Sequence, residues 1–320
     1  MLTVATWNLE NFLLPGAEGG PTSQQAFDDK VAHLKQTIEL INPDVLGVQE
    51  VGQPAALDKL RDELAGGWHA ISSQHPDGRG IRTGFLSKLP FTASEDVVAF
   101  PASLKPIQQK DDGTTEHEMG RGALRVRVQH GGVDIDLISC HLKSKLLSFP
   151  GHKPGTTSFQ PKDEDQRARY GAYALYRRAA EAATVRSYVD GLLDGHGADR
   201  ALVLLGDMND EASAATTQML QGPPGSQIGT GGFDHPDGGD GNRLWNLAPL
   251  IPEGEGWSRI FEGKHELIDH LLASRKLVGP NNLPGVRVHH QGAVSIGVDP
   301  KPRVDEPASD HDPVFAHFNV

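Results

Sequence analysis

Residues of the kinds that bind divalent cations or activate water recur at the ends of hydrophobic segments in this sequence. Such residues lie within, end, directly follow or directly precede six of these segments. For example, Asp207 and Asn209 follow the apolar run 201–205. An ionised carboxylate beside a buried strand is costly unless it is paired or bound to a metal. One such residue could be a cap or a turn residue, but six clusters predict one shared site. The candidates are Asn8, Glu10, Glu50, His141, Asp207, Asn209, Asp269, Asp310 and His311.

The chemistry of this set favours a hard cation. Its members carry carboxylate, amide and imidazole groups, and none carries a thiol. Oxygen ligands suit Mg²⁺ or Mn²⁺ better than zinc. The single cysteine, Cys140, precedes His141 on a predicted strand, so the two side chains point to opposite faces and we expect Cys140 to pack rather than to act as a nucleophile.

Six sequence blocks resemble the successive signature motifs of the DNase I-like endonuclease/exonuclease/phosphatase family. They stand in the family's order between residues 6 and 318, and GDMND and SDH are the most specific of them. The resemblance implies an α/β (α+β) fold, a four-layer αββα sandwich with two mainly antiparallel sheets face to face and helices outside. It also implies hydrolysis of phosphate esters with Mg²⁺ or Mn²⁺ and without a covalent enzyme intermediate. The blocks are TWNLENF, VLGVQEV, SCHLKSK, LLGDMND, LIDHLLAS and SDHDPVFAHF.

The same resemblance implies a role for each residue near the metal. Glu50 is the principal metal ligand, and Asn8 beside it helps to position the metal or the phosphate. Asp310 is expected near the metal site. Glu10 stands where some relatives place a further acidic ligand, so one metal or two remains open at this point.

The remaining candidates are implied to act on water and phosphate. Asp207 would orient or deprotonate the attacking water, and Asn209 would hold a phosphate oxygen. His141 would donate to a non-bridging oxygen; His311 would do the same or transfer a proton, with Asp269 orienting its imidazole. The resemblance leaves open whether Asp207 or His311 is the base. Phosphodiester hydrolysis needs this combination of a positioned water, neutralised oxygens and a stabilised leaving group.

Charge limits how such an enzyme could hold nucleic acid. The formal net charge is −12, which excludes a broad basic surface. A local cationic rim near the catalytic strand ends is still predicted, and it favours DNA or RNA as the substrate, cut with little sequence specificity. The candidate substrate-binding residues are Arg121, Lys143, Lys145, Arg167 and Arg169.

Two other functions compete with that of a nuclease. A phosphatase of the same fold, acting on a small ester such as an inositol phosphate or a nucleotide, would need a compact basic pocket, and the sequence leaves it open. A catalytically dead binding module is disfavoured because every block keeps its chemically competent residue. The Gly-, Asp-, Lys- and Pro-rich loops argue against docking to a membrane, and no obligate protein partner is evident.

The elements that must position these residues follow from hydrophobic periodicity. Strands are predicted at 2–9, 45–51, 68–72, 82–87, 123–129, 133–140, 201–205, 267–273, 286–290 and 313–318. Helices are predicted from Phe27 to Ile41, around Leu60, and over 166–194. Long loops occupy 100–120, 145–165 and 222–243. No linker-like break separates these elements, so one domain over residues 1–320 is expected.

Composition also bears on the cellular compartment of the protein. No apolar run approaches the roughly 20 residues needed to span a bilayer, and residues 1–8 lack the features of a signal peptide. We therefore expect a cytoplasmic protein, although a secreted form without its leader would look the same. The His289–His290 pair is expected at the surface.

Overall fold

Two six-stranded β-sheets form the centre of the molecule. The computed structural model describes residues 1–153, 156–297 and 303–320. The first sheet has the order β17–β18–β1–β2–β4–β3, with β1 and β2 parallel and its other neighbours antiparallel. Its strands are β1 (Leu2–Phe12), β2 (Val45–Val51), β3 (His69–Ser72), β4 (Arg82–Ser87), β17 (Gly285–Val288) and β18 (Val314–Phe318).

The second sheet has the order β13–β16–β12–β9–β8–β5. Only β9 and β12 are parallel, so both sheets are mainly antiparallel around one parallel pair. Its strands are β5 (Ala93–Ala99), β8 (Glu118–His130), β9 (Val133–His141), β12 (Ala201–Asp207), β13 (Trp245–Asn246) and β16 (Asp269–Ala273).

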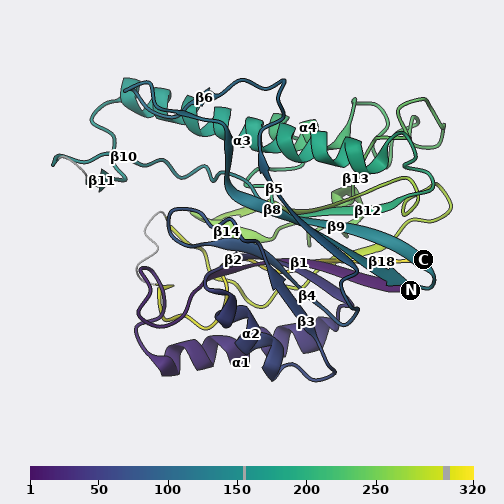
Figure 1. Ribbon diagram of the computed structural model, residues 1–320, viewed down its shortest axis with the longest axis horizontal. Helices are drawn as coiled ribbons and strands as arrows, with labels where there is room; N and C mark the ends of the chain where they lie inside the picture. Colours follow the sequence, from purple (N-terminus) through teal and green to yellow (C-terminus); the bar gives the residue numbers. More distant parts are fainter. Residues whose placement is uncertain (154–155, 298–302) are drawn as a thin grey trace.

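Helices cover the outer face of each sheet (Figure 1). The helices α1 (Gln24–Ile41) and α2 (Pro54–Glu63) lie on the first sheet, and α3 (Glu164–Leu193) and α4 (Ala215–Gln221) lie on the second. Local chemistry sets the helix ends: the Ser23 side chain accepts a hydrogen bond from the Ala26 amide at the start of α1, and Asn42 ends that helix in the left-handed region.

Three buried apolar clusters separate these layers. One lies between the sheets and joins residues such as Val4 and Phe85 to Val126 and Leu205. The second packs α3 against the second sheet, and the third packs α1 and α2 against the first. The predicted four-layer αββα sandwich is therefore confirmed. No helix in the described parts of the chain has the length and apolarity needed to cross a membrane.

Some elements differ from the prediction. The edge strand β5 is absent from the predicted strands, because only one of its seven residues is buried and it lacks a clear apolar alternation. The predicted loops at 100–120 and 145–165 contain two small hairpins, and a third lies near residue 260. These hairpins are β6 (Ile107–Gln108) with β7 (Thr115–Glu116), β10 (Phe149–Pro150) with β11 (Thr157–Ser158), and β14 (Arg259–Phe261) with β15 (Lys264–Glu266). A short 3₁₀ helix covers Ala248–Leu250.

The sheets are tied together by close packing and by buried hydrogen bonds. Gly47 of β2 faces Leu205 of β12 so closely that a side chain at position 47 would overlap the leucine. Nearby, Gln49 Nε2 donates to Ser139 Oγ over 3.0 Å. These contacts fix the carboxyl ends of β1 and β2 opposite those of β9 and β12.

Candidate active site

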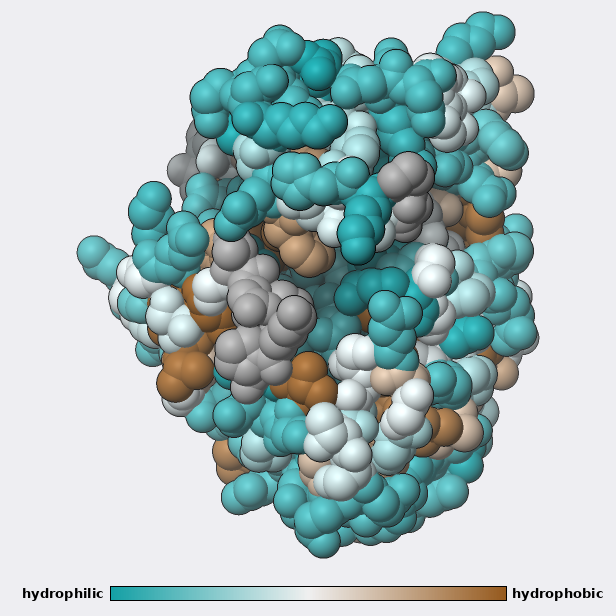
Figure 2. Space-filling view, turned by 90° about the vertical axis from the view of Figure 1, so that its left-hand side faces the viewer, coloured by the Kyte–Doolittle hydropathy of each residue, from teal (hydrophilic) through white to brown (hydrophobic). Residues whose placement is uncertain are grey.

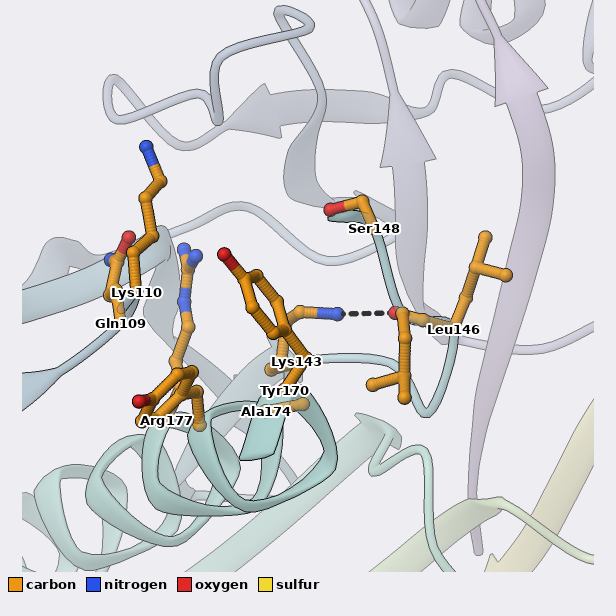
Figure 3. Close-up of a pocket in the computed structure, with 10 residues that line it drawn as sticks. Gln109, Lys110, Lys143, Leu146, Ser148, Tyr170, Ala174 and Arg177 are labelled. Carbon is orange, nitrogen blue, oxygen red and sulfur yellow. Dashed lines mark hydrogen bonds between the residues drawn. The ribbon is translucent and has the colours of Figure 1, made fainter. Parts of the chain in front are cut away.

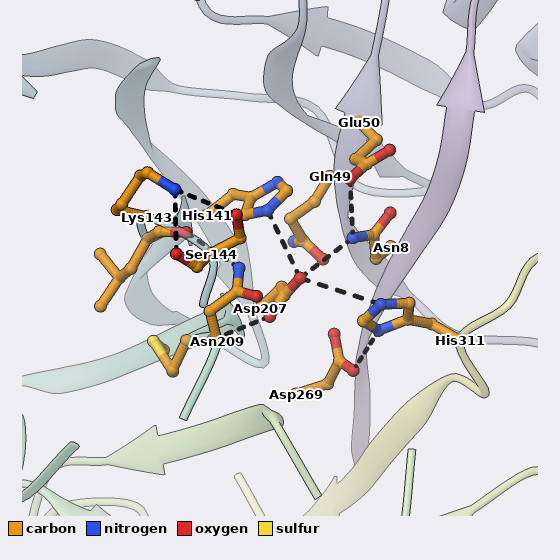
Figure 4. Close-up of polar contacts among 12 residues, drawn as sticks. Asn8, Gln49, Glu50, His141, Lys143, Ser144, Asp207, Asn209, Asp269 and His311 are labelled. Atoms are coloured by element: carbon orange, nitrogen blue, oxygen red, sulfur yellow. Dashed lines mark hydrogen bonds and ion pairs between the residues drawn. The ribbon is translucent and has the colours of Figure 1, made fainter. Parts of the chain in front are cut away.

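A cavity opens where these strand ends meet. It has a volume of about 190 Å³, and the face that carries it has a recess with a hydrophilic interior (Figure 2). Eight of the nine candidate catalytic and metal-binding residues line it, and the ninth, Asp269, lies buried beneath (Figure 4). The predicted residues at the wall are Asn8, Glu10, Glu50, His141, Asp207, Asn209, Asp310 and His311.

The backbone is strained at several of these positions. Non-glycine residues rarely adopt positive φ, and such strain is concentrated at functional sites. Among the described residues seven non-glycines do so, and four of them line the cavity. These four are Glu10, Asn11, Glu50 and Asn209, with φ between 45° and 58°. The strand ends are thus bent to turn their side chains inward.

Asp207 is the centre of the site. Its Oδ2 atom accepts a hydrogen bond from Asn8 Nδ2 at 3.1 Å, across the gap between the sheets. The same oxygen lies 3.4 Å from His141 Nε2 and 3.9 Å from His311 Nε2. Burial, and next the carboxylate of Asp269, raise the pKa of Asp207 to about 6, against the lowering effect of His311.

His311 and Asp269 form a buried pair. Asp269 Oδ2 lies 2.6 Å from His311 Nδ1, which orients the ring so that Nε2 faces Asp207. Burial alone would lower the pKa of His311. The carboxylates of Asp269, Asp310 and Asp207 outweigh that effect and raise this pKa to about 10. His311 is therefore an imidazolium at neutral pH.

His141 is held by an arginine. Arg121 Nη1 lies 2.5 Å from His141 Nδ1, and Arg121 Nη2 forms an ion pair with Asp77 at 2.9 Å. Because a guanidinium only donates, Nδ1 must accept, and the ring proton sits on Nε2, facing Asp207. Burial, and next the charge of Arg121, hold the pKa of His141 well below its usual range. His141 is thus a neutral donor, and Arg121, predicted to contact substrate, contacts this imidazole.

Arg121 can be tested separately from the acidic residues. Arg121→Gln should lower the rate of ester hydrolysis by about tenfold, since it removes the charge that keeps His141 neutral and oriented. Its replacement also leaves Asp77 with the more distant Arg79, at 4.0 Å, in place of Arg121. Steady-state kinetics of Arg121→Gln and Arg121→Lys should show partial rescue by lysine. Equal and complete inactivation of both variants, with loss of folding, would assign Arg121 a purely structural role.

Glu50 and Asn8 form the part of the site best suited to a cation. Glu50 Oε2 accepts from the Asn11 amide at 2.8 Å, and Oε1 lies 3.4 Å from Asn8 Nδ2. Within the described ranges, neither Glu50 nor Asp207 forms an ion pair with lysine or arginine. Carboxylates without a lysine or arginine partner supply the hard oxygen ligands that Mg²⁺ or Mn²⁺ prefers. The residues present therefore fit such an ion.

A second set of groups meets a purely geometric criterion for a metal site. Asp207, Asp269 and His311 each place one oxygen or nitrogen within 4.8 Å of the others. However, the hydrogen bond between Asp269 and His311 already uses Nδ1 of the imidazole. That pair is better suited to orienting His311, so we favour Glu50 over Asp269 as a ligand.

Two predicted roles meet competing contacts. Both carboxylate oxygens of Glu10 pair with Arg303 at 2.7 Å, and Oε2 also accepts from the Asp310 amide at 2.9 Å. This neutralised carboxylate argues against Glu10 as a second metal ligand. Asn209 uses its amide nitrogen to donate to the Leu142 carbonyl at 2.9 Å, so at least part of its role is to support the loop after β9.

The predicted basic rim does not assemble at the cavity. Lys143 Nζ turns away and donates to the carbonyls of Ser144 and Leu146. Three further residues of the predicted rim are neutralised by neighbouring acids. Lys145 pairs with Asp210 at 3.0 Å, Arg167 with Glu164 at 2.6 Å, and Arg169 with Asp111 at 2.9 Å and also with Asp165. Of the five predicted substrate-binding residues, only Arg121 lines the cavity.

Other basic residues at the cavity were missed from the sequence. Arg79 has a side chain 56% exposed at the wall, and its Nη1 lies 3.3 Å from Asn11 Oδ1. Arg259 and Arg303 also line the cavity, each paired with a glutamate. None lies in a recognised motif, so only the tertiary structure reveals them. His290, expected at the surface, has a side chain that is 26% exposed; it lies 2.8 Å from Asp312 and stacks on Trp257.

Comparison with known proteins supports this fold and chemistry. The model of the endonuclease/exonuclease/phosphatase family matches residues 5–311. No curated protein matches the sequence as a relative. Similar solved structures include humanized D. rerio TDP2, at 16% identity and TM-score 0.53, covering 100% of this chain and 99% of that one.

Two further structures show the range of proteins that share this fold. One is D. rerio TDP2 complexed with a single strand DNA product, at 16% identity and TM-score 0.55, covering 100% of this chain and 99% of that one. The other is the mannosyl-6-phosphatase Bt3783 of Bacteroides thetaiotaomicron VPI-5482, at 14% identity and TM-score 0.56, with both chains fully covered. At such identities the likeness concerns the fold alone.

Proposed function

This chain belongs to the endonuclease/exonuclease/phosphatase family, whose members hydrolyse phosphoester bonds, and from that premise we propose that it is a Mg²⁺- or Mn²⁺-dependent phosphodiesterase that cuts nucleic acid. One observation carries the chemical part of this proposal. Asp207 Oδ2 stands where Asn8, His141 and His311 converge from both sheets, and Asn8 also contacts Glu50, which has no lysine or arginine partner among the described residues. This arrangement offers a base, two donors and a cation ligand around one point.

In the proposed reaction Glu50 holds the cation, with Asn8 and Asp207 close to it. When bound, the cation supplies Lewis acidity towards a phosphate oxygen and helps to neutralise developing charge. Asp207 orients the attacking water and accepts its proton. With a pKa of about 6 it is mostly ionised at neutral pH yet basic enough for this task.

The two histidines act as donors. His311 is the imidazolium that Asp269 stabilises, and it donates to the leaving oxygen or to a non-bridging oxygen. His141 donates from Nε2 to a non-bridging oxygen, because Arg121 occupies its other nitrogen. This division of labour assigns the base to Asp207 rather than to His311.

Nucleic acid is the proposed substrate for two reasons. A protein of the same fold is known in complex with a single strand DNA product, and the exposed Arg79 places a cation at the wall of the cavity. The failure of the predicted rim to assemble favours a second candidate, a phosphatase for a small ester, and another protein of this fold is a mannosyl-6-phosphatase.

A substrate panel separates the two candidates. We expect the protein, with Mg²⁺ or Mn²⁺, to cleave single-stranded or plasmid DNA, or RNA, with little sequence preference. Gel analysis of these substrates, beside phosphate release from inositol phosphates, nucleotides and sugar phosphates, measures both activities. Release of phosphate from a small monoester while all nucleic acids stay intact would replace the nuclease by the phosphatase.

A further inference from the structure

A second cavity, of about 120 Å³, adjoins the active-site cavity. Leu146 lines both, so this side chain stands between the two cavities. The second cavity lies between the N-terminal half of α3, the loop after β9 and the hairpin β6–β7 (Figure 3). Its walls include Lys110, Lys143, Arg177, Tyr170 and Tyr173.

The charge of this cavity is opposite to that of the protein. Three of its lining residues are cationic and none is acidic, in a chain of net charge −12. Lys110 is exposed and forms no ion pair among the described residues. The Lys143 ammonium is held by the Ser144 and Leu146 carbonyls rather than by a carboxylate. Burial, and next Arg177, lower the pKa of Lys143 to about 8, which still leaves it mostly charged at neutral pH.

A buried carboxylate fixes the geometry of these cations. Glu181 is 2% exposed and accepts from Arg177 Nε at 3.0 Å, from the Gly120 amide at 3.1 Å and from the Lys143 amide at 2.7 Å. Arg177 Nη2 rests on Gly120, where any side chain would collide with the guanidinium. The glycine and the glutamate together set Arg177 and the backbone of Lys143 in place before any ligand arrives.

Besides Glu181, which pairs with Arg177, one further acid next to a lining residue is also paired. Asp111 follows Lys110, but its carboxylate pairs with Arg169 at 2.9 Å and accepts from the Tyr173 hydroxyl at 3.1 Å. The Tyr173 ring packs edge-on against Tyr170, and the two form an aromatic wall. Three cations beside an aromatic wall, of which Arg177 is held in place by Glu181, match a phosphate with its attached sugar and base.

We propose that this second cavity is a subsite that binds the phosphate neighbouring the cleaved one in a single-stranded nucleic acid, through Lys110, Lys143 and Arg177. The subsite rests on the proposed nuclease function and deepens it. It supplies the strand contact that the predicted rim does not, and Leu146 lies between the two phosphates. The strand then runs from the active-site cavity towards the start of α3.

Binding measurements test the subsite independently of cleavage. Fluorescence anisotropy of a labelled single-stranded DNA oligonucleotide would be recorded with Mg²⁺ in a His311→Ala background, in which cleavage is disabled. The test variants are Lys110→Ala and Lys110→Ala/Lys143→Met, in which methionine keeps the half-buried stem. Lys59→Ala/Arg200→Ala removes the same charge from exposed positions outside both cavities.

The double test variant should bind about tenfold more weakly than its parent, and Lys110→Ala by a smaller factor. The slope of log Kd against log salt should fall by about 0.7, the change expected when the protein neutralises one phosphate fewer on a single strand. The control should change neither quantity. If Lys143→Met merely misplaced the loop after β9, binding would weaken without this change of slope. Because Lys110 is exposed, the single variant Lys110→Ala tests the loss of charge without disturbing the fold.

The outcomes separate the subsite from the proposed function. Equal affinity and slope in test and control variants would overturn the subsite, even if the wild type cleaves DNA. Binding that depends on Lys110 and Lys143, in a wild type that cleaves no nucleic acid, would keep the subsite and overturn the nuclease. A protein that does not bind the oligonucleotide at all would overturn the subsite directly.

Discussion

Asp207→Asn should slow phosphoester hydrolysis by about a hundredfold or more, the usual contribution of a positioned base. The amide keeps the size of the carboxylate but cannot accept the proton of the attacking water. The amide also binds the cation more weakly than the carboxylate does, and this would add to the loss of activity. Initial rates with saturating Mg²⁺ measure the effect, and Asp134→Asn, on the exposed part of β9, is the matched control.

The stability of this variant should be unchanged or higher without metal. The pKa of Asp207 in the folded protein, about 6, lies above its ordinary value of 3.8, so ionisation at pH 7 costs the folded state free energy. Asparagine removes this cost, and Tm by calorimetry in a chelator should hold or rise. A parallel loss of activity and Tm would contradict the base role and make Asp207 a structural residue.

Removal of the divalent cation should abolish activity, and Mg²⁺ or Mn²⁺ should restore it. Lewis acid stabilisation contributes several kcal/mol, so the residual rate should be about a thousandfold lower. Glu50→Gln should raise the metal concentration for half-maximal activity and lower the maximal rate, because Glu50 is a carboxylate at the cavity that has no basic partner in the described parts of the chain. Metal titration of the rate gives both quantities.

The matched control for Glu50 is Glu63→Gln on α2, an exposed glutamate paired with Lys59. It should leave the metal titration as in the wild type. Undiminished hydrolysis in excess chelator would show that the reaction needs no divalent cation. A metal titration of Glu50→Gln that matches the wild type would move the cation site to another set of ligands.

The alternation of strands and helices and the polar residues at the strand ends were predictable from short-range rules, whereas the four-layer sandwich was implied by the family resemblance. Apolar runs specify strands, and parallel strands such as β1 and β2 bring their carboxyl ends to the same edge of a sheet. Asn8 and Glu50 therefore meet, as do His141 and Asp207 on β9 and β12. The contact between Asp269 and His311 agrees with the orienting role that the family resemblance implied.

The partners of the charged side chains could not be predicted. Glu10 pairs with Arg303, 293 positions away, and Arg121 turns to His141 rather than outward. Such choices depend on which element lies opposite, and that is decided only when the sheets pack. The lysines and arginines after β9 were placed near the site by sequence distance alone. In the structure, Asp210, Asp111 and acids on α3 bind three of the four instead.

The site is divided between the two sheets. Asn8 and Glu50 belong to the first sheet and Asp207 and His141 to the second, while the bond from Asn8 to Asp207 bridges them. The proposed cation ligand and the proposed base thus belong to two different sheets. Their relative placement is set where Gly47 lets Leu205 approach, inside the core and out of reach of substrate. The spacing of the sheets therefore sets the distance between the groups that each sheet contributes to the reaction. We expect Gly47, a core residue that does not contact the phosphate, to influence the rate in this way.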